Sequence, residues 1–158
     1  MNRMSLVVSL SLLAACGTAS PDDGSGEACE HLQQGPSVAV TAASDSGAAP
    51  PSVTESHKRF DIALVADQAG GAHGGRVSYA SSSAGDHALY LSAEVPVEVT
   101  DASATVVTFE STVGAVSACT EVKSKRTLEL GVGTYTLRFG PTSVSNVSLV
   151  IESVAHAD

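Results

Sequence analysis

The chain has 158 residues, with 17 acidic side chains against 8 basic ones and a formal net charge of −9 at neutral pH. A chain of this length is expected to build about one domain. The excess of acid excludes nucleic acid as a partner and argues against a polybasic grip on anionic lipid head groups, because clustered lysine and arginine bind both of those surfaces.

The N-terminus has the pattern of an export signal in residues 1–15. Arg3 supplies a positive charge, and an uncharged apolar stretch follows from Leu6 to Leu13. A helix that spans a membrane needs about 20 apolar residues, so this stretch is too short to remain as a transmembrane segment. It therefore predicts a signal that is removed after export.

The end of this signal, Leu13-Ala14-Ala15-Cys16, resembles the lipobox of bacterial lipoproteins. In that family the cysteine takes a diacylglyceryl group, the signal is cut just before it, and the new amine is usually acylated. The resemblance implies lipidation of Cys16 and anchoring to a membrane, since two or more acyl chains hold a protein firmly. Gly17 stands where aspartate retains enteric lipoproteins at the inner membrane, which indicates the outer membrane, in its periplasmic or surface leaflet. An ordinary secretory signal cut after Ala15 is the alternative.

The rest of the chain divides into a tether and a domain. Residues 16–28 are small, polar and acidic without an apolar period, and such composition predicts a flexible tether. Residues 29–158 then form the domain, whose regular strands are expected mainly in 58–153. A short strand is predicted at Val38 and Val40, before a second loose stretch over 42–56.

Two cysteines remain once Cys16 is assigned to lipid. Export places Cys29 and Cys119 in an oxidising compartment, where such a pair usually forms a disulfide. The bridge would close a loop of about 90 residues and contribute about 4–5 kcal/mol in the chain-entropy model. The competing interpretation makes Cys29 and the nearby His31 soft metal ligands.

From Lys58 onward, apolar and polar residues alternate in short stretches separated by turns. This period of two is typical of strands with one buried and one exposed face. The pattern predicts an all-β fold, an antiparallel, jelly-roll-like β-sandwich of eight or nine strands. No helix is expected outside the signal. Gly70 to Gly75 is predicted to be a loop, and Gly131-Val132-Gly133 a hairpin turn. The strands are expected around Phe60–Leu64, Val77–Tyr79, Leu89–Leu91, Val95–Val99, Thr105–Phe109, Cys119–Leu130, Tyr135–Phe139 and Val147–Ile151.

The last third carries a second resemblance. The segment Leu130 to Phe139, with Gly133-Thr134-Tyr135 at its turn, and the strand from Asn146 to Glu152 resemble the close of bacterial pre-peptidase C-terminal-type jelly-roll domains. The likeness covers residues 57–153. It implies a non-catalytic accessory module, with no catalytic residue to carry over.

The sequence contains no Gly-x-Ser-x-Gly, Ser-x-x-Lys, His-Glu-x-x-His or phosphate-loop motif. The residues with most chemical interest are therefore histidines, because neutral imidazoles bind Zn or Cu. We take four of them as candidate metal ligands, with Glu30 or Asp86 as a carboxylate that completes the site. These are His31, His57, His87 and His156.

These observations favour a lipid-anchored envelope protein that serves as a non-enzymatic binding or structural module, with an envelope protein or a glycan as its partner. One alternative is a lipoprotein that binds Zn or Cu through the histidines. Another is a hydrolase, because catalytic triads assemble from residues far apart in a sequence.

Overall fold

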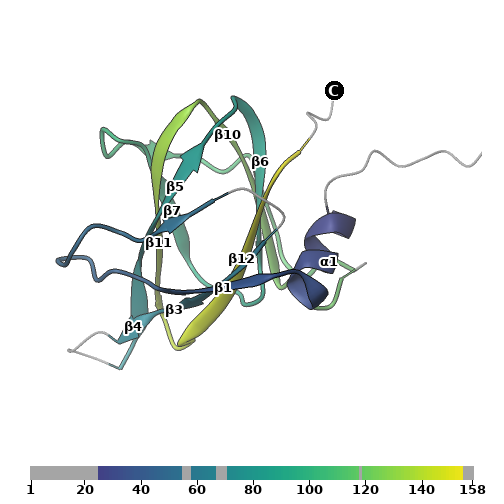
Figure 1. The fold of residues 1–158 in the computed structure, drawn as a ribbon, viewed down its shortest axis with the longest axis horizontal. Helices are drawn as coiled ribbons and strands as arrows, with labels where there is room; N and C mark the ends of the chain where they lie inside the picture. Colours follow the sequence, from purple (N-terminus) through teal and green to yellow (C-terminus); the bar gives the residue numbers. More distant parts are fainter. Residues whose placement is uncertain (1–24, 55–57, 67–70, 118, 155–158) are drawn as a thin grey trace, which may run out of the picture.

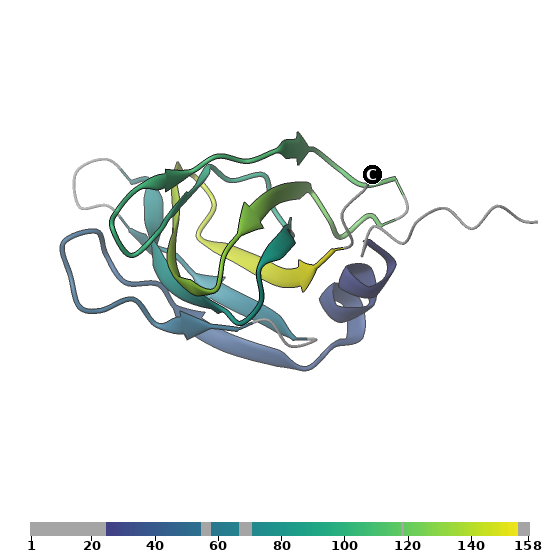
Figure 2. The ribbon, with the colours of Figure 1, turned by 90° about the horizontal axis from the view of Figure 1, so that it is seen from above.

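The structure, a computed structural model, describes residues 25–54, 58–66, 71–117 and 119–154. Two β-sheets face each other in these ranges, and one helix lies at one end of them (Figures 1 and 2). No helix of the described residues is both long and apolar enough to cross a membrane. The elements are α1 (Ser25–Gln34), β1 (Ser37–Thr41), β2 (Ser52–Val53), β3 (Arg59–Ala63), β4 (Val65–Ala66), β5 (His73–Ser81), β6 (Gly85–Leu91), β7 (Val97–Thr100), β8 (Val106–Val107), β9 (Ser111–Val113), β10 (Ser124–Leu130), β11 (Gly133–Thr142) and β12 (Asn146–Ser153).

The predicted β-sandwich is confirmed. The first sheet, called sheet A, has the order β1-β3-β12-β6-β10-β9, and sheet B has the order β2-β5-β11-β7-β8 with β4 paired to β5. Both sheets are mixed and not purely antiparallel, because β1 joins β3 and β2 joins β5 in parallel. Parallel neighbours need a long crossover, and the stretch that was predicted to be loose, 42–56, lies in the crossover from β1 to β3 and contains the short strand β2. The described residues also hold more strands than the eight or nine expected.

The main core lies between the two sheets. Valine, leucine and isoleucine supply most of it, as the low aromatic content requires, and Tyr79 and Phe139 are its largest fully buried side chains. Each such side chain contributes about 1.5–3 kcal/mol when it leaves water. In both sheets, every second side chain of a strand points into this core. The period of two in the sequence therefore predicted the fold.

The outer face of sheet A carries a second, smaller cluster beneath α1. Ala88 and Tyr90 of β6 point away from the main core and pack with Ala28 and Leu32 of α1. The expectation that no helix follows the signal is therefore wrong, and residues 25–28, assigned to the tether, belong to α1. An isolated helix of 10 residues is marginal in water. This one is stabilised by the sheet face that it covers.

Two glycine segments differ from their predicted roles. Gly131-Val132-Gly133 connects β10 in sheet A to β11 in sheet B, so it is a link between sheets and not a hairpin turn. The Tyr135 side chain holds this link: the Gly131 N–H donates to the Tyr135 hydroxyl at 3.0 Å, and that hydroxyl donates to the Gly131 carbonyl at 3.2 Å. Gly74 and Gly75 lie inside β5, not in a loop.

The molecule has two ends along its long axis, which we call the helix end and the cleft end. At the helix end, α1 lies beside the turn that precedes β10, and Arg59 Nη1 donates to the Leu32 carbonyl at 2.7 Å. At the cleft end lie the loop between β1 and β2, the short strand β4 and the start of β5. Figure 1 shows α1 on the right and β4 on the left, and Figure 2 keeps the two ends apart in the perpendicular view.

Candidate functional site

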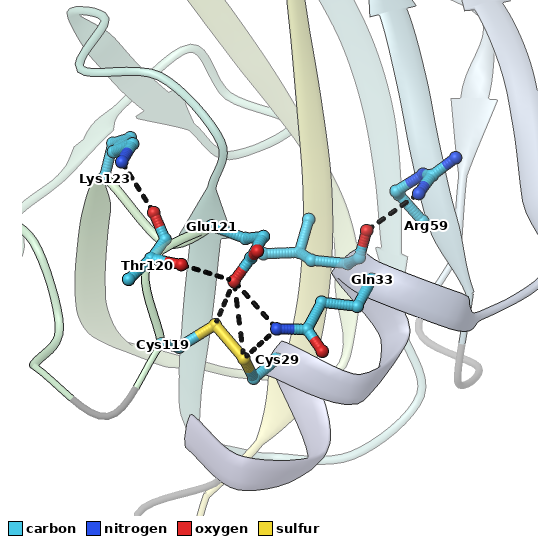
Figure 3. The surroundings of a disulfide bond; sticks show 8 residues. Cys29, Gln33, Arg59, Cys119, Thr120, Glu121 and Lys123 are labelled. Atoms are coloured by element: carbon cyan, nitrogen blue, oxygen red, sulfur yellow. Dashed lines mark hydrogen bonds between the residues drawn. A yellow bond between two sulfur atoms is a disulfide. The ribbon is translucent and has the colours of Figure 1, made fainter.

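A disulfide joins α1 to the turn before β10 at the helix end. The Cα atoms of Cys29 and Cys119 lie 5.7 Å apart, and their sulfurs are bonded (Figure 3). The predicted disulfide is thus confirmed. The alternative, in which Cys29 and His31 bind a metal together, is wrong, because the Cys29 sulfur is bonded to another sulfur and is not a thiolate ligand.

Glu121 lies over this disulfide (Figure 3). Its Oε2 accepts hydrogen bonds from Gln33 Nε2 at 2.8 Å and from Thr120 Oγ1 at 3.1 Å. The hydrogen bond from Gln33 is the largest cause that lowers the pKa of Glu121. The same oxygen is 3.6 and 4.0 Å from the two sulfurs, and these are contacts only, since disulfide sulfurs carry no hydrogen. Glu121 and the cysteines therefore form a structural link and not a metal site.

The structure describes two of the four histidines proposed as ligands, His31 and His87, whereas Cys16, His57 and His156 lie outside the described residues. His87 is fully buried: its Nδ1 lies 2.9 Å from the Gly85 carbonyl oxygen, and its ring makes a T-shaped contact with the ring of Tyr79 in the main core. Side chains alternate across a strand, so His87 faces the interior, while His31 on α1 lies outside sheet A. The two do not share a site.

His31 lies instead between two carboxylates. Its Nε2 is 3.6 Å from Oε1 of Glu27, one helical turn earlier on α1, and 3.9 Å from Oε1 of Glu152 on β12. Of the carboxylates suggested by the sequence, neither Glu30 nor Asp86 belongs to this group. The sequence reasoning missed Glu27 because it lay in the predicted tether, and Glu152 because it belonged to the polar face of a predicted strand. The four-residue spacing from Glu27 to His31 was the available signal.

The cleft end holds a cavity of about 670 Å³. Sites for small molecules are usually about 300–1,000 Å³, so this volume suits a small ligand. Strands β5 and β11 form its base, and the loop after β1 forms one wall. The lining residues are Ser44, Asp45, Ser46, Val65, Ala66, Ala72, His73, Gly74, Gly75, Arg138, Phe139 and Pro141.

The base of the cleft depends on glycine. Gly75 has a φ of 145°, and a Cβ there would lie 2.7 Å from the Ala42 Cβ and 2.9 Å from the Ala43 carbonyl oxygen. A Cβ on Gly74 would lie 2.8 Å from the carbonyl oxygen of Phe139. No real side chain fits such distances without a backbone shift, so glycine lets the loop after β1 and strand β11 lie close against β5.

The charged wall of the cleft is built by Asp45 and Arg138, and Arg76 lies next to Asp45 without lining the cavity. Arg76 and Arg138 are directly opposite each other on β5 and β11, an arrangement of like charges that is unfavourable by itself. Asp45 from the loop lies against both: Arg138 Nη2 donates to Asp45 Oδ2 at 2.6 Å, and Arg76 Nε is 3.9 Å from Asp45 Oδ1. Arg76 also donates through Nη2 to the Ser44 carbonyl at 2.8 Å. The wall is thus a fixed set of donors and acceptors.

These contacts shift the protonation equilibria of the pair. The hydrogen bonds from Arg138 are the largest cause that lowers the pKa of Asp45, and the same bonds raise the pKa of Arg138. Both side chains stay about half exposed, at 52% for Asp45 and 42% for Arg138. Both groups are therefore charged at neutral pH and reachable from the cleft. The sequence placed Arg138 on the polar face of a strand, but nothing in it paired that residue with Asp45, 93 positions away.

Neither a protein-family model nor a curated protein matches this chain.

Proposed function

We propose that the chain is a lipid-anchored, non-enzymatic binding module of a bacterial envelope, and that its cleft binds a polar ligand rich in hydroxyl groups, such as a segment of envelope glycan. The observation that carries this proposal is the Asp45–Arg138 pair, bound by two hydrogen-bonding nitrogens and half exposed in the wall of a cavity of about 670 Å³.

The chemistry of the pair favours hydroxyl groups. An arginine offers up to five donors and a carboxylate offers only acceptors, so a hydroxyl, which both donates and accepts, can bond to both members. The charges of Asp45 and Arg138 offset each other, and Arg76 does not line the cavity, so the lining does not favour a strongly charged ligand. Arg76 helps to hold Asp45 in place before any ligand arrives, and a site fixed in advance loses less entropy on binding.

The disulfide supports export. Disulfides form and persist in oxidising compartments such as the periplasm and the cell surface, and Cys29–Cys119 is a bond of that kind. The lipobox-like segment at Cys16 supports the anchor. Since α1 begins at Ser25, soon after that cysteine in the chain, the helix end is expected nearest the membrane and the cleft end farthest from it.

The cleft is tested by titrating the full chain, purified in mild detergent, with soluble peptidoglycan fragments and neutral oligosaccharides while its amide NMR signals are recorded. We expect shifts confined to the loop after β1, the start of β5 and the end of β11. Arg138→Gln is expected to weaken binding by about 10- to 100-fold, the usual value of a hydrogen bond from a charged group.

The matched control is Lys58→Gln, which makes the same change of charge at an exposed position just before β3, at the helix end. Its affinity is expected to equal that of the unchanged protein. If no sugar shifts the signals of the cleft, or if both variants bind equally well, the proposed ligand class is wrong.

The anchor is tested by expressing the chain with its signal in a Gram-negative host and separating membranes from soluble extract. We expect the protein in the membrane fraction, with the mass of a diacylglyceryl group on Cys16. Cys16→Ser should remain uncleaved or become soluble. A Cys16→Ser protein processed and distributed like the original would contradict lipid anchoring and favour cleavage as an ordinary secretory signal.

A further inference from the structure

We propose that Glu27, His31 and Glu152 form a Zn²⁺ site between α1 and β12, at the end of the sandwich opposite the cleft. Their ligand atoms lie within 4.8 Å of one another. The site is separate from the proposed ligand cleft, and neither depends on the other.

The distances fit a small, tetrahedral cation. Zinc binds histidine nitrogen and carboxylate oxygen at about 2.0–2.2 Å, so two ligands of a tetrahedral site lie about 3.4 Å apart. The observed separations from His31 Nε2 are 3.6 Å to Glu27 and 3.9 Å to Glu152. The two distances from His31 thus need a contraction of only a few tenths of an ångström. The two carboxylates lie within 4.8 Å of each other, and rotation of the exposed Glu27 side chain can bring them closer.

The chain supplies these ligands from two elements that are held together. Glu27 and His31 are four residues apart on α1 and so lie on one helix face. Cys29 lies between them in the sequence, and its disulfide ties this turn of the helix to the segment before β10. Leu32 and Ala28 pack on the same sheet face, against Val150 of β12. The helix is therefore fixed next to Glu152 without any metal.

Burial and charge favour a cation at this point. The side chains of His31 and Glu152 are only 15% and 9% exposed, whereas Glu27 is 46% exposed. Two carboxylates thus meet one imidazole in a partly dry place, where a divalent cation is attracted strongly. Glu27 faces solvent and leaves an entry path, and water takes the fourth position, as in open zinc sites with three protein ligands.

Zinc fits the ligand set better than the hard cations of the envelope. Calcium needs six to eight oxygen ligands and magnesium an octahedral oxygen shell. One imidazole with two carboxylates suits a borderline ion such as Zn²⁺. Copper(II) binds most nitrogen and oxygen sites more tightly than zinc does, but it prefers a tetragonal arrangement.

The experiment is calorimetric titration of ZnCl₂ into the full chain, purified in mild detergent with its disulfide oxidised and stripped of metal. We expect one ion per chain. Glu152→Gln and His31→Ala should each weaken binding at least 100-fold, and Glu27→Gln about 10-fold because that side chain is more exposed. Co²⁺ bound in place of zinc should give the intense visible bands of a four-coordinate site.

The matched control is Glu30→Gln, which removes the same charge from an exposed position of the same helix outside the cluster. It should bind zinc as tightly as the unchanged protein. Urea unfolding of each metal-free variant shows that it is folded, and Glu152→Gln keeps the shape of the side chain. Absence of binding at 100 μM zinc, or an equal loss in Glu30→Gln, overturns the proposal and leaves the three residues as an ion-pair cluster. Loss of sugar binding would not affect this result, since the cleft lies at the other end.

Discussion

The two ends of the sandwich are stabilised by different means. At the helix end a disulfide ties a short helix to the turn before β10, and the apolar side chains of Ala28 and Leu32 pack it on the sheet. At the cleft end no disulfide joins the residues that the structure describes. The surface there is shaped by the close approach of neighbouring segments to Gly74 and Gly75 and by the Asp45–Arg138 pair. The same fold thus positions its helix with a disulfide, and it shapes its cleft with glycines, whose missing side chains let neighbouring segments lie close together. Substitutions at each end should therefore have separable effects.

The largest effect is expected from removing the disulfide. Replacing Cys29 and Cys119 together by serine should lower the free energy of unfolding by about 4–5 kcal/mol in the chain-entropy model. Urea denaturation measures this. The amide protons of α1 should then exchange faster than those of β5 and β11, because the helix end alone loses its link. Equal acceleration at both ends would show that the ends are not independent.

A smaller effect is expected from Leu32→Ala. Leu32 is 5% exposed beneath α1, and truncation of a buried leucine costs about 2–5 kcal/mol. The value should fall at the low end, because α1 lies on the surface and can settle into the space. Zinc affinity should fall with it, while the cleft signals in NMR spectra stay in place. Val132→Ala, at a valine that is 72% exposed, serves as the neutral comparison in the same unfolding assay.

Gly75→Ala should damage the cleft end at a cost of about 1–3 kcal/mol. The reasons are its positive φ and the approach of Ala42 and Ala43. Gly85→Ala is a matched control, because Gly85 has a φ of 138° but no neighbouring atom within 4 Å of the position that a Cβ would take. Both variants carry the conformational penalty, so the difference between their melting temperatures measures the close approach alone. Equal losses would remove the argument that this glycine shapes the cleft.

The smallest effect concerns Asp45→Asn. An exposed ion pair contributes less than about 1 kcal/mol. Because the pKa of Asp45 is lowered in the folded chain, its contribution is present above the ordinary aspartate pKa and is lost as the pH falls through the folded value. Unfolding curves of the two proteins should therefore differ slightly at pH 7 and converge in acid, once the pH has fallen through the pKa that Asp45 has in the folded chain. A difference that persists in acid would assign the effect to something other than the carboxylate charge.

The repetitive part of the fold was predictable from local sequence. Val38 and Val40 alternate with small residues, whereas Phe60 and Ile62, and Leu137 and Phe139, alternate with polar ones. Each stretch forms a strand with those residues on one face. The helix was not predictable in the same way. Its two buried apolar positions, Ala28 and Leu32, sit in a polar segment, and Gly35-Pro36 was the only clear stop signal after it.

The candidate sites show the same division. The disulfide was predictable, because the chain has three cysteines, and the prediction of lipid on Cys16 leaves a single pair. The Asp45–Arg138 pair and the Glu27–His31–Glu152 group were not, because each joins residues that are far apart in the chain. His31 was named as a ligand, but its partners were not, and His87 was placed with it although the two lie on opposite faces of sheet A.

The sequence by itself predicted a β-sandwich and favoured a disulfide between Cys29 and Cys119, both of which the structure bears out, and its lipobox-like segment predicts lipid on Cys16. These features rest on local periodicity, on a short motif and on the chemistry of one residue type. Only the tertiary structure decided which sheet each strand joins, that residues 25–34 form a helix on sheet A, and which polar groups meet at each end. Those outcomes depend on contacts between segments that are far apart in the chain. Such contacts stabilise the protein only after the entropy lost on bringing the segments together has been offset.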